Sequence, residues 1–218
     1  EQKVSLYINK YHPDYKAIIQ NGSWFPLIPS NKPRICIIQD NLRKMNILSR
    51  IQEYNFYKSE YIVTNSNEVD NYYSERNTFQ IPLGVDNKLF SVLDKNEMRK
   101  KQNIDTTKYK KIGIFVGAMN EVKGWNRIIN IINEHPDIYW IIVSKHKERI
   151  NIPNGIVYNQ VNQNQLCELY NCADFFIIGS PSETQCLAAI ECCLCDVPII
   201  MRDTGFVTNL SSEEKNQI

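Results

Sequence analysis

The feature that most constrains the fold of this chain is the alternation of short apolar runs with longer polar and amphipathic stretches. Runs rich in β-branched and aromatic residues predict strands at 4–8, 16–20, 34–39, 61–65, 79–83, 111–117, 138–144, 155–159, 174–180 and 197–201. Between them, residues 126–135 and 163–173 have the apolar spacing of helices. Strands that are apolar on both faces and alternate with helices are typical of parallel sheets of the doubly wound type.

A polar stretch, "DKNEMRKKQNIDTTKYKK" at 94–111, separates two series of these strands. The chain has 218 residues, which is enough for two small α/β domains with their own cores. We therefore expect a boundary within about 84–108 and two Rossmann-like domains that face each other. The first, a shortened amino-terminal domain, would cover 1–95, and the carboxy-terminal domain would cover 96–218.

Composition excludes several functions. The formal net charge of +1 gives no basic face for nucleic acid, and no apolar run approaches the roughly 18 residues of a membrane-spanning helix. Six of the seven cysteines fall within 167–195, where we interpret them as small buried hydrophobes of a reducing cytoplasm. Cys192 and Cys195 form a CxxC that lacks a second pair, so no zinc site, and no other cofactor, is predicted.

The stretch "SPSETQCLAAIECCLCDVP", residues 180–198, places a glutamate inside an apolar helix. Glu191 is surrounded in sequence by alanine, leucine, isoleucine and cysteine, a pattern typical of a buried helix. An unpaired buried carboxylate is strongly disfavoured, so Glu191 needs hydrogen-bond donors. Two sources of donors remain open at this point: the two hydroxyls of a bound ribose, or an arginine in the core.

Two further charged residues are expected at the carboxyl edge of the same sheet, where doubly wound folds bind ligands. Glu183 precedes a helix that we expect to begin near Gln185 or Cys186, and the first N–H groups of that helix would form an anion site. Lys123 follows the strand that ends at Gly117 and would neutralise a diphosphate there. The alternatives are a helix-start glutamate favoured by the helix dipole and a solvated loop lysine.

Four segments, in order along the chain, carry a resemblance to a known family. They are "QIPLGVDNKLF" (80–90), "FVGAMNEVKGW" (115–125), "LCELYNCADFFIIGSPSET" (166–184) and "ETQCLAAIECCLCDVPII" (183–200). The chain resembles the retaining glycosyltransferases of family 4 (glycosyltransferase group 1), whose GT-B fold has two facing Rossmann-like domains. The last segment matches the two glutamates, eight positions apart, that characterise this family.

The resemblance implies a nucleotide-diphosphate sugar, UDP- or GDP-linked, as donor and no metal. It assigns Glu183 to the transferred sugar, Glu191 to the ribose and Lys123 to the diphosphate. The other donor-binding positions that it implies are Gly117, Val161, Asn162, Thr184, Gln185, Cys186 and Leu187. Among these, the amides of Cys186 and Leu187 would face the phosphates, and the backbone of residues 161–162 would meet the base.

The chain departs from the family pattern at several positions. Ala118 stands where an arginine is usual, Thr184 to Cys186 replace a Gly-Phe-Gly, and Asp196 replaces a glycine. Near the usual histidine of the first domain this chain has Gln39 and Asp40. The first strand of the family and its Gly-rich loop have no evident counterpart before Val4.

The resulting hypothesis is a retaining glycosyltransferase that moves a sugar to a hydroxyl of a saccharide, lipid-linked or protein acceptor. We expect a cytoplasmic location, peripheral to a membrane if the acceptor is lipid-linked. The first alternative is a catalytically weak or inactive relative that binds or scaffolds. A dinucleotide-dependent oxidoreductase is disfavoured because no GxGxxG follows any expected strand.

Overall fold

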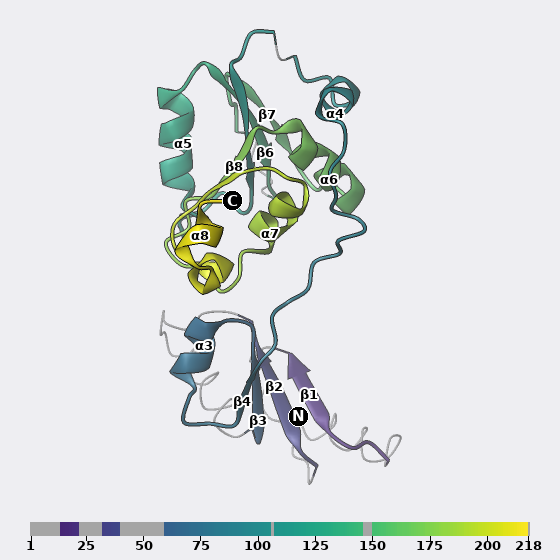
Figure 1. The fold of residues 1–218 in the computed structure, drawn as a ribbon, viewed down its shortest axis with the longest axis vertical. Helices are drawn as coiled ribbons and strands as arrows, with labels where there is room; N and C mark the ends of the chain where they lie inside the picture. The colour runs from purple at the N-terminus through teal and green to yellow at the C-terminus, as the bar shows by residue number, and fades with distance from the viewer. Residues whose placement is uncertain (1–13, 22–31, 40–58, 106, 146–149, 218) are drawn as a thin grey trace. The chain divides into compact units, whose positions relative to one another are not determined.

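The computed structural model describes residues 14–21, 32–39, 59–105, 107–145 and 150–217 (Figure 1). The chain divides into two compact units, Glu1–Leu83 and Gly84–Ile218. The strand expected at 4–8 and the side chain of Asp40 lie outside the described residues.

The first unit contains a sheet of four parallel strands in the order β1-β2-β3-β4. The elements are β1 (Ile18–Asn21), β2 (Arg34–Ile38), β3 (Tyr61–Thr64), α3 (Asn67–Tyr72) and β4 (Thr78–Gln80). Side chains of β2 and β3 pack with α3 in a small core of Cys36, Ile38, Ile62, Val69 and Tyr73. The predicted strand positions are confirmed here to within a few residues, because each strand carries its own run of apolar side chains.

The second unit contains a five-stranded parallel sheet in the order β7-β6-β5-β8-β9. Its strands are β5 (Lys111–Val116), β6 (Ile138–Val143), β7 (Gly155–Tyr158), β8 (Phe175–Ile177) and β9 (Ile199–Ile200). Its helices are α4 (Lys95–Lys101), η1 (Glu121–Lys123), α5 (Trp125–Glu134), α6 (Gln163–Cys172), α7 (Leu187–Leu194), η2 (Gly205–Asn209) and α8 (Ser212–Lys215). Helix α5 lies on one side of the sheet, and α4 and α6 lie on the other (Figure 1).

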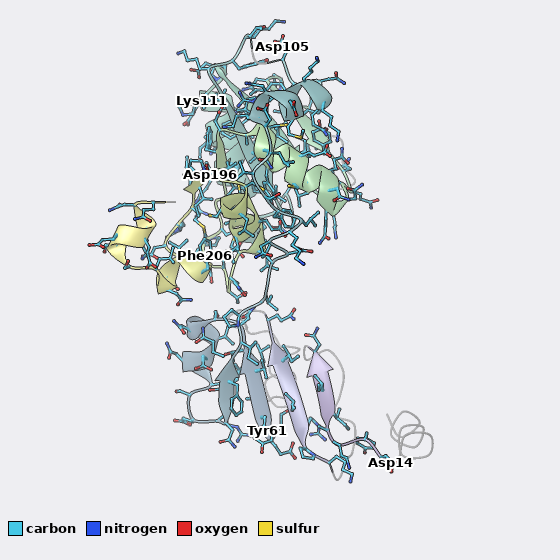
Figure 2. The ribbon with its side chains drawn as sticks, turned by 45° about the vertical axis from the view of Figure 1, so that its right-hand side comes forward. Asp14, Tyr61, Asp105, Lys111, Asp196 and Phe206 are labelled. Atoms are coloured by element: carbon cyan, nitrogen blue, oxygen red, sulfur yellow. The ribbon has the colours of Figure 1, made fainter. Side chains whose placement is uncertain are left out.

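The strand order of this sheet determines where a ligand site forms. From β5 the chain proceeds to β6 on one side, and β8 then pairs with β5 on the other side. Loops that follow β5 and β8 therefore meet beside a switch in the direction of winding, which is where open α/β sheets bind ligands. Lys111, the first residue of β5, and Phe206 of η2 lie at opposite ends of the second unit (Figure 2). The carboxyl end of β5 thus points toward the end that holds η2.

Residues 84–95, which the sequence analysis placed in the first domain, pack within the second unit. Phe90 is buried in the core of that unit, in edge contact with Tyr170 of α6. The N–H of Leu93 donates to Asn171 Oδ1 at 2.8 Å, and Asn171 Nδ2 donates to the carbonyl of Ser91 at 3.0 Å. The division at 83/84 therefore precedes the expected boundary at 95/96, because the polar run after residue 94 includes a helix of the second unit, α4.

Candidate functional site

Lys123 is positioned by the loop that follows β5. Asn120 caps the short helix η1, and its Oδ1 accepts a hydrogen bond from the N–H of Lys123 at 3.0 Å. Gly124 follows with φ 68°, a left-handed conformation that glycine adopts without strain. This turn lets α5 begin immediately after Lys123.

A contact between two glycines joins this loop to the loop that follows β8. A Cβ atom on Gly124 would lie 2.0 Å from the carbonyl oxygen of Gly179, so no other side chain fits there. The same carbonyl accepts a hydrogen bond from Arg127 Nη1 at 3.0 Å. The Gly124–Gly179 contact therefore brings Lys123 close to the segment that carries Glu183.

Lys123 and Glu183 form an ion pair across these two loops. Lys123 Nζ lies 2.8 Å from Glu183 Oε1 and 2.9 Å from Oε2, although sixty residues separate them in sequence. The Glu183 side chain is 8% exposed and that of Lys123 is 32% exposed. The N–H of Glu183 donates to Thr204 Oγ1 at 2.8 Å, which holds the glutamate backbone in place. Thr204 was not singled out by sequence, since nothing in its local pattern indicates this contact.

Glu191 lies on α7 and is half-buried, whereas the apolar pattern around it predicted a buried position. Its Oε2 accepts a hydrogen bond from the hydroxyl of Tyr170 at 2.9 Å. Among the described residues, no donor contacts Oε1, and Glu191 forms no ion pair with an arginine. Burial raises the pKa of Glu191, and the Tyr170 hydrogen bond lowers it in part. One carboxylate oxygen thus remains open to a ligand.

Tyr170 is a site residue that the sequence analysis missed. Its side chain is fully buried, and burial together with the Glu191 charge raises its pKa well above the ordinary value. Its hydroxyl therefore stays protonated and donates to Glu191. The available signal was a tyrosine two residues before the end of an amphipathic helix, α6, but its partner lies on another helix, α7, and could not be identified locally.

The amino end of α7 is open to an anion. Cys186 precedes the helix with φ 61°, and the helix itself begins at Leu187, one residue after the expected range. The N–H groups of Leu187 and Ala188 meet no acceptor among the described residues, as expected for the first turn of a helix. Thr184 and Gln185 lie in the preceding loop, half-buried and buried respectively.

The pKa of Cys186 indicates that Glu183, Lys123 and Glu191 all lie near the start of α7. Burial, together with the carboxylates of Glu183 and Glu191, raises the pKa of the Cys186 thiol to about 12, while the Ala189 N–H and Lys123 oppose the shift. All three charges therefore act on one side chain. The structure thus brings together the residues that sequence assigned separately to the sugar, the ribose and the diphosphate.

A cavity of about 370 Å³ opens at the carboxyl ends of β5 and β6. Its lining is largely apolar and consists of Val116, Gly117, Ala118, Val143, Ser144, Lys145, Gln160, Val161 and Leu166. Two predicted positions, Gly117 and Val161, therefore lie on the same cavity. The Asn162 side chain instead caps α6, where its Oδ1 accepts from the N–H of Gln165 at 2.9 Å, so only its backbone is available to a ligand.

The described residues contain no group of three or more histidine, cysteine or acidic side chains arranged to hold a metal ion. The seven cysteines are free, and the sulfurs of Cys167 and Cys195 lie 4.0 Å apart. Within the described parts of the chain, no helix has the length and apolarity needed to cross a membrane.

Comparison with known proteins supplies the family. The family model described as "Glycosyl transferases group 1" matches residues 94–218, more than half of the chain. This protein belongs to the group 1 glycosyltransferases. The match covers the second unit apart from its first residues and includes every site residue described above.

Solved structures of similar fold extend the comparison to both units. Sucrose-phosphate synthase from Thermosynechococcus elongatus superposes with a TM-score of 0.76 at 17% identity, over 95% of this chain and 61% of its own. Anabaena HepE in complex with UDP-glucose gives a TM-score of 0.76 at 14% identity, over 97% of this chain and 65% of its own. The catalytic domain of starch synthase IV from Arabidopsis thaliana, bound to ADP and acarbose, gives 0.69 at 11% identity, over 95% and 60%.

These likenesses confirm an α/β fold of the GT-B type with parallel Rossmann-like sheets. The chain spans less than two thirds of the length of the first two of these structures. No curated protein sequence matches the chain significantly.

Proposed function

We propose that this group 1 glycosyltransferase binds a nucleotide-diphosphate sugar in its second unit and transfers the sugar to an acceptor hydroxyl with retention of configuration. The observation that carries the proposal is Glu191, a carboxylate on an apolar helix with one oxygen bonded to Tyr170 and the other open. The UDP-glucose and UDP complexes of Anabaena HepE support a uridine nucleotide, and the ADP complex of starch synthase IV supports testing adenine.

The site offers a place for each part of such a donor. The base would occupy the largely apolar cavity beside Gly117 and Val161, where burial of its faces is favourable. The ribose hydroxyls would donate to Glu191 Oε1, which no donor among the described residues contacts. The phosphates would lie at the open N–H groups of Leu187 and Ala188, where the helix dipole favours negative charge.

Sugar binding would then require the Lys123–Glu183 ion pair to open. In the structure each residue neutralises the other at 2.8–2.9 Å. A diphosphate would attract Lys123, and the hydroxyls of the attached sugar would donate to Glu183 in its place. A nucleoside diphosphate without its sugar leaves Glu183 unpaired, so return of the ion pair would favour release of this product.

In this scheme Lys123 and the helix N–H groups stabilise the charge that develops on the departing diphosphate. No metal is called for, because these groups supply the positive potential. The acceptor is a saccharide, lipid or protein hydroxyl, and a lipid-linked acceptor would place the protein at the surface of a cytoplasmic membrane.

A catalytically inactive binding protein is the second candidate, and Ala118 favours it. Alanine at this position adds no cation and Lys123 is paired with Glu183, so a departing diphosphate would receive less countercharge than an arginine at position 118 would give. Such a protein would bind nucleotide without transferring sugar. Turnover therefore separates the two candidates.

The first experiment measures thermal protection by UDP, GDP and ADP. One of these nucleotides should raise the melting temperature of the wild type, and Glu191→Gln should abolish the shift. The matched control is Glu134→Gln, an exposed glutamate at the end of α5, which should retain it. Equal shifts in both variants would exclude Glu191 from the site, and no shift for the wild type with any nucleotide would refute a donor site.

The second experiment incubates the protein with the matching nucleotide sugars and follows release of the nucleotide. Proton NMR of the product should show the anomeric configuration of the donor. An inverted product would refute the proposed stereochemistry, and binding without any transfer or hydrolysis would favour the inactive binding protein.

A further inference from the structure

The cavity beside the donor site contains a cation that neither the sequence pattern nor the ion pairs account for. Lys145 lies on the wall of the 370 Å³ cavity, together with Gly117 and Ala118. It is exposed, and no carboxylate among the described residues pairs with it. An unpaired lysine at the wall of a largely apolar cavity is suited to an anionic ligand that enters there.

Strand register explains why Lys145 is found beside Ala118. Val116 of β5 pairs with Val143 of β6, and the N–H of Gly117 donates to the carbonyl of Val143 at 3.0 Å. Ala118 lies two residues after Val116, and Lys145 lies two residues after Val143. The two parallel strands that they follow are neighbours, about 4.8 Å apart. Both residues therefore lie at the same edge of the sheet and line the same cavity.

The charges of Lys123, Glu183 and Glu191 explain why a further cation at Lys145 would matter for binding a diphosphate. Lys123 is neutralised by Glu183 at 2.8 Å, and Glu191 adds a carboxylate without an opposing cation among the described residues. A nucleoside diphosphate carries more than one negative charge, which Lys123 and the N–H groups at the start of α7 would balance only in part. Lys145 lines the cavity and forms no ion pair among the described residues, so its ammonium group can balance the charge of the diphosphate.

We propose that Lys145 supplies this charge by pairing its ammonium group with a phosphate of the bound nucleotide, at the edge of the sheet where Ala118 offers no cation. The inference rests on the proposed donor site and adds a residue that determines its affinity for the diphosphate. The long, flexible side chain of lysine allows it to act from the wall of the cavity on a phosphate at the cavity mouth.

The test compares nucleotide with nucleoside binding by calorimetry, in the full chain. Lys145→Ala should weaken binding of UDP, or of GDP or ADP if the wild type prefers it, by about tenfold, the value of one charge-assisted contact. Binding of the corresponding nucleoside, which has no phosphate, should not change. Lys145→Arg should retain affinity, and Lys111→Ala, at the opposite end of β5, is the matched control.

Two further measurements assign the effect to charge. The affinity of Lys145→Ala should depend less on salt concentration than that of the wild type. Adding Ala118→Arg to Lys145→Ala should restore much of the lost affinity, because it places a cation on the neighbouring strand end.

The outcomes separate this inference from the donor-site proposal. Wild-type binding that Lys145→Ala leaves intact overturns the role of Lys145 and leaves the donor site standing. An equal loss for nucleoside and nucleotide also overturns it, since the lysine would then act on the cavity and not on phosphate. A wild type that binds none of the nucleotides overturns both.

Discussion

The Gly124–Gly179 contact predicts a large and specific effect of adding one methyl group. In Gly124→Ala the new Cβ would lie 2.0 Å from the Gly179 carbonyl oxygen, whereas ordinary contact begins near 3.4 Å. The clashing atom belongs to backbone, so the two loops must separate. Because these loops carry Lys123 and Glu183, the substitution should weaken both the fold and the ion pair.

The size of the effect follows from two terms. An alanine at φ 68° costs about 1–2 kcal/mol relative to glycine. Overpacking of a rigid contact adds about 1–3 kcal/mol. The expected loss is therefore about 2–5 kcal/mol, which corresponds to a decrease in melting temperature of roughly 5 to 15 °C.

The assay is thermal and urea unfolding followed by tryptophan fluorescence, since Trp125 and Trp140 are both buried in the second unit. Gly84→Ala is the control, because a Cβ there would meet nothing within 4 Å. Gly179→Ala should fall between them, since its Cβ would lie 2.8 Å from the Gly124 carbonyl oxygen without a left-handed φ. If Gly124→Ala proves as stable as Gly84→Ala, the inferred contact between the loops does not exist.

Four other substitutions test local features of the second unit. Asp196 has φ 57° just after α7, so Asp196→Gly should raise the free energy of unfolding by about 1 kcal/mol in urea titrations, and Asn103→Gly, at an equivalent helix end, by less. Burial raises the pKa of Glu191, so its stabilising contribution declines as pH rises above the ordinary value of about 4.3. Glu191→Gln should therefore gain stability relative to the unliganded wild type at neutral pH and lose that gain in acid; a pH-independent difference would contradict this reasoning. Asp174 has a lowered pKa, because the Ile112 N–H and the cations of α4 outweigh burial, so its contribution is present above the ordinary pKa and lost as pH falls; Asp174→Asn should cost about 2 kcal/mol at pH 7 and little in acid.

Much of the fold and part of the site could be predicted from sequence, because their signals are local. Apolar runs predicted strands such as β6 to within a residue, and the spacing of apolar positions predicted α5 and α6. The same local pattern showed that Glu191 lies on an apolar helix and needs a donor. Motifs along the chain indicated the family, which the match to residues 94–218 confirms.

Tertiary structure alone decided which residues meet. The pairing of Lys123 with Glu183 depends on β8 lying beside β5, and the Tyr170–Glu191 hydrogen bond depends on how α6 packs near α7. The register of β5 and β6 places Lys145 beside Ala118 on the wall of one cavity. Side-chain periodicity carries information about burial over a few residues. The two hydrogen-bonded contacts span 21 and 60 residues, and the place of Lys145 follows from strand register, so no local pattern encodes them.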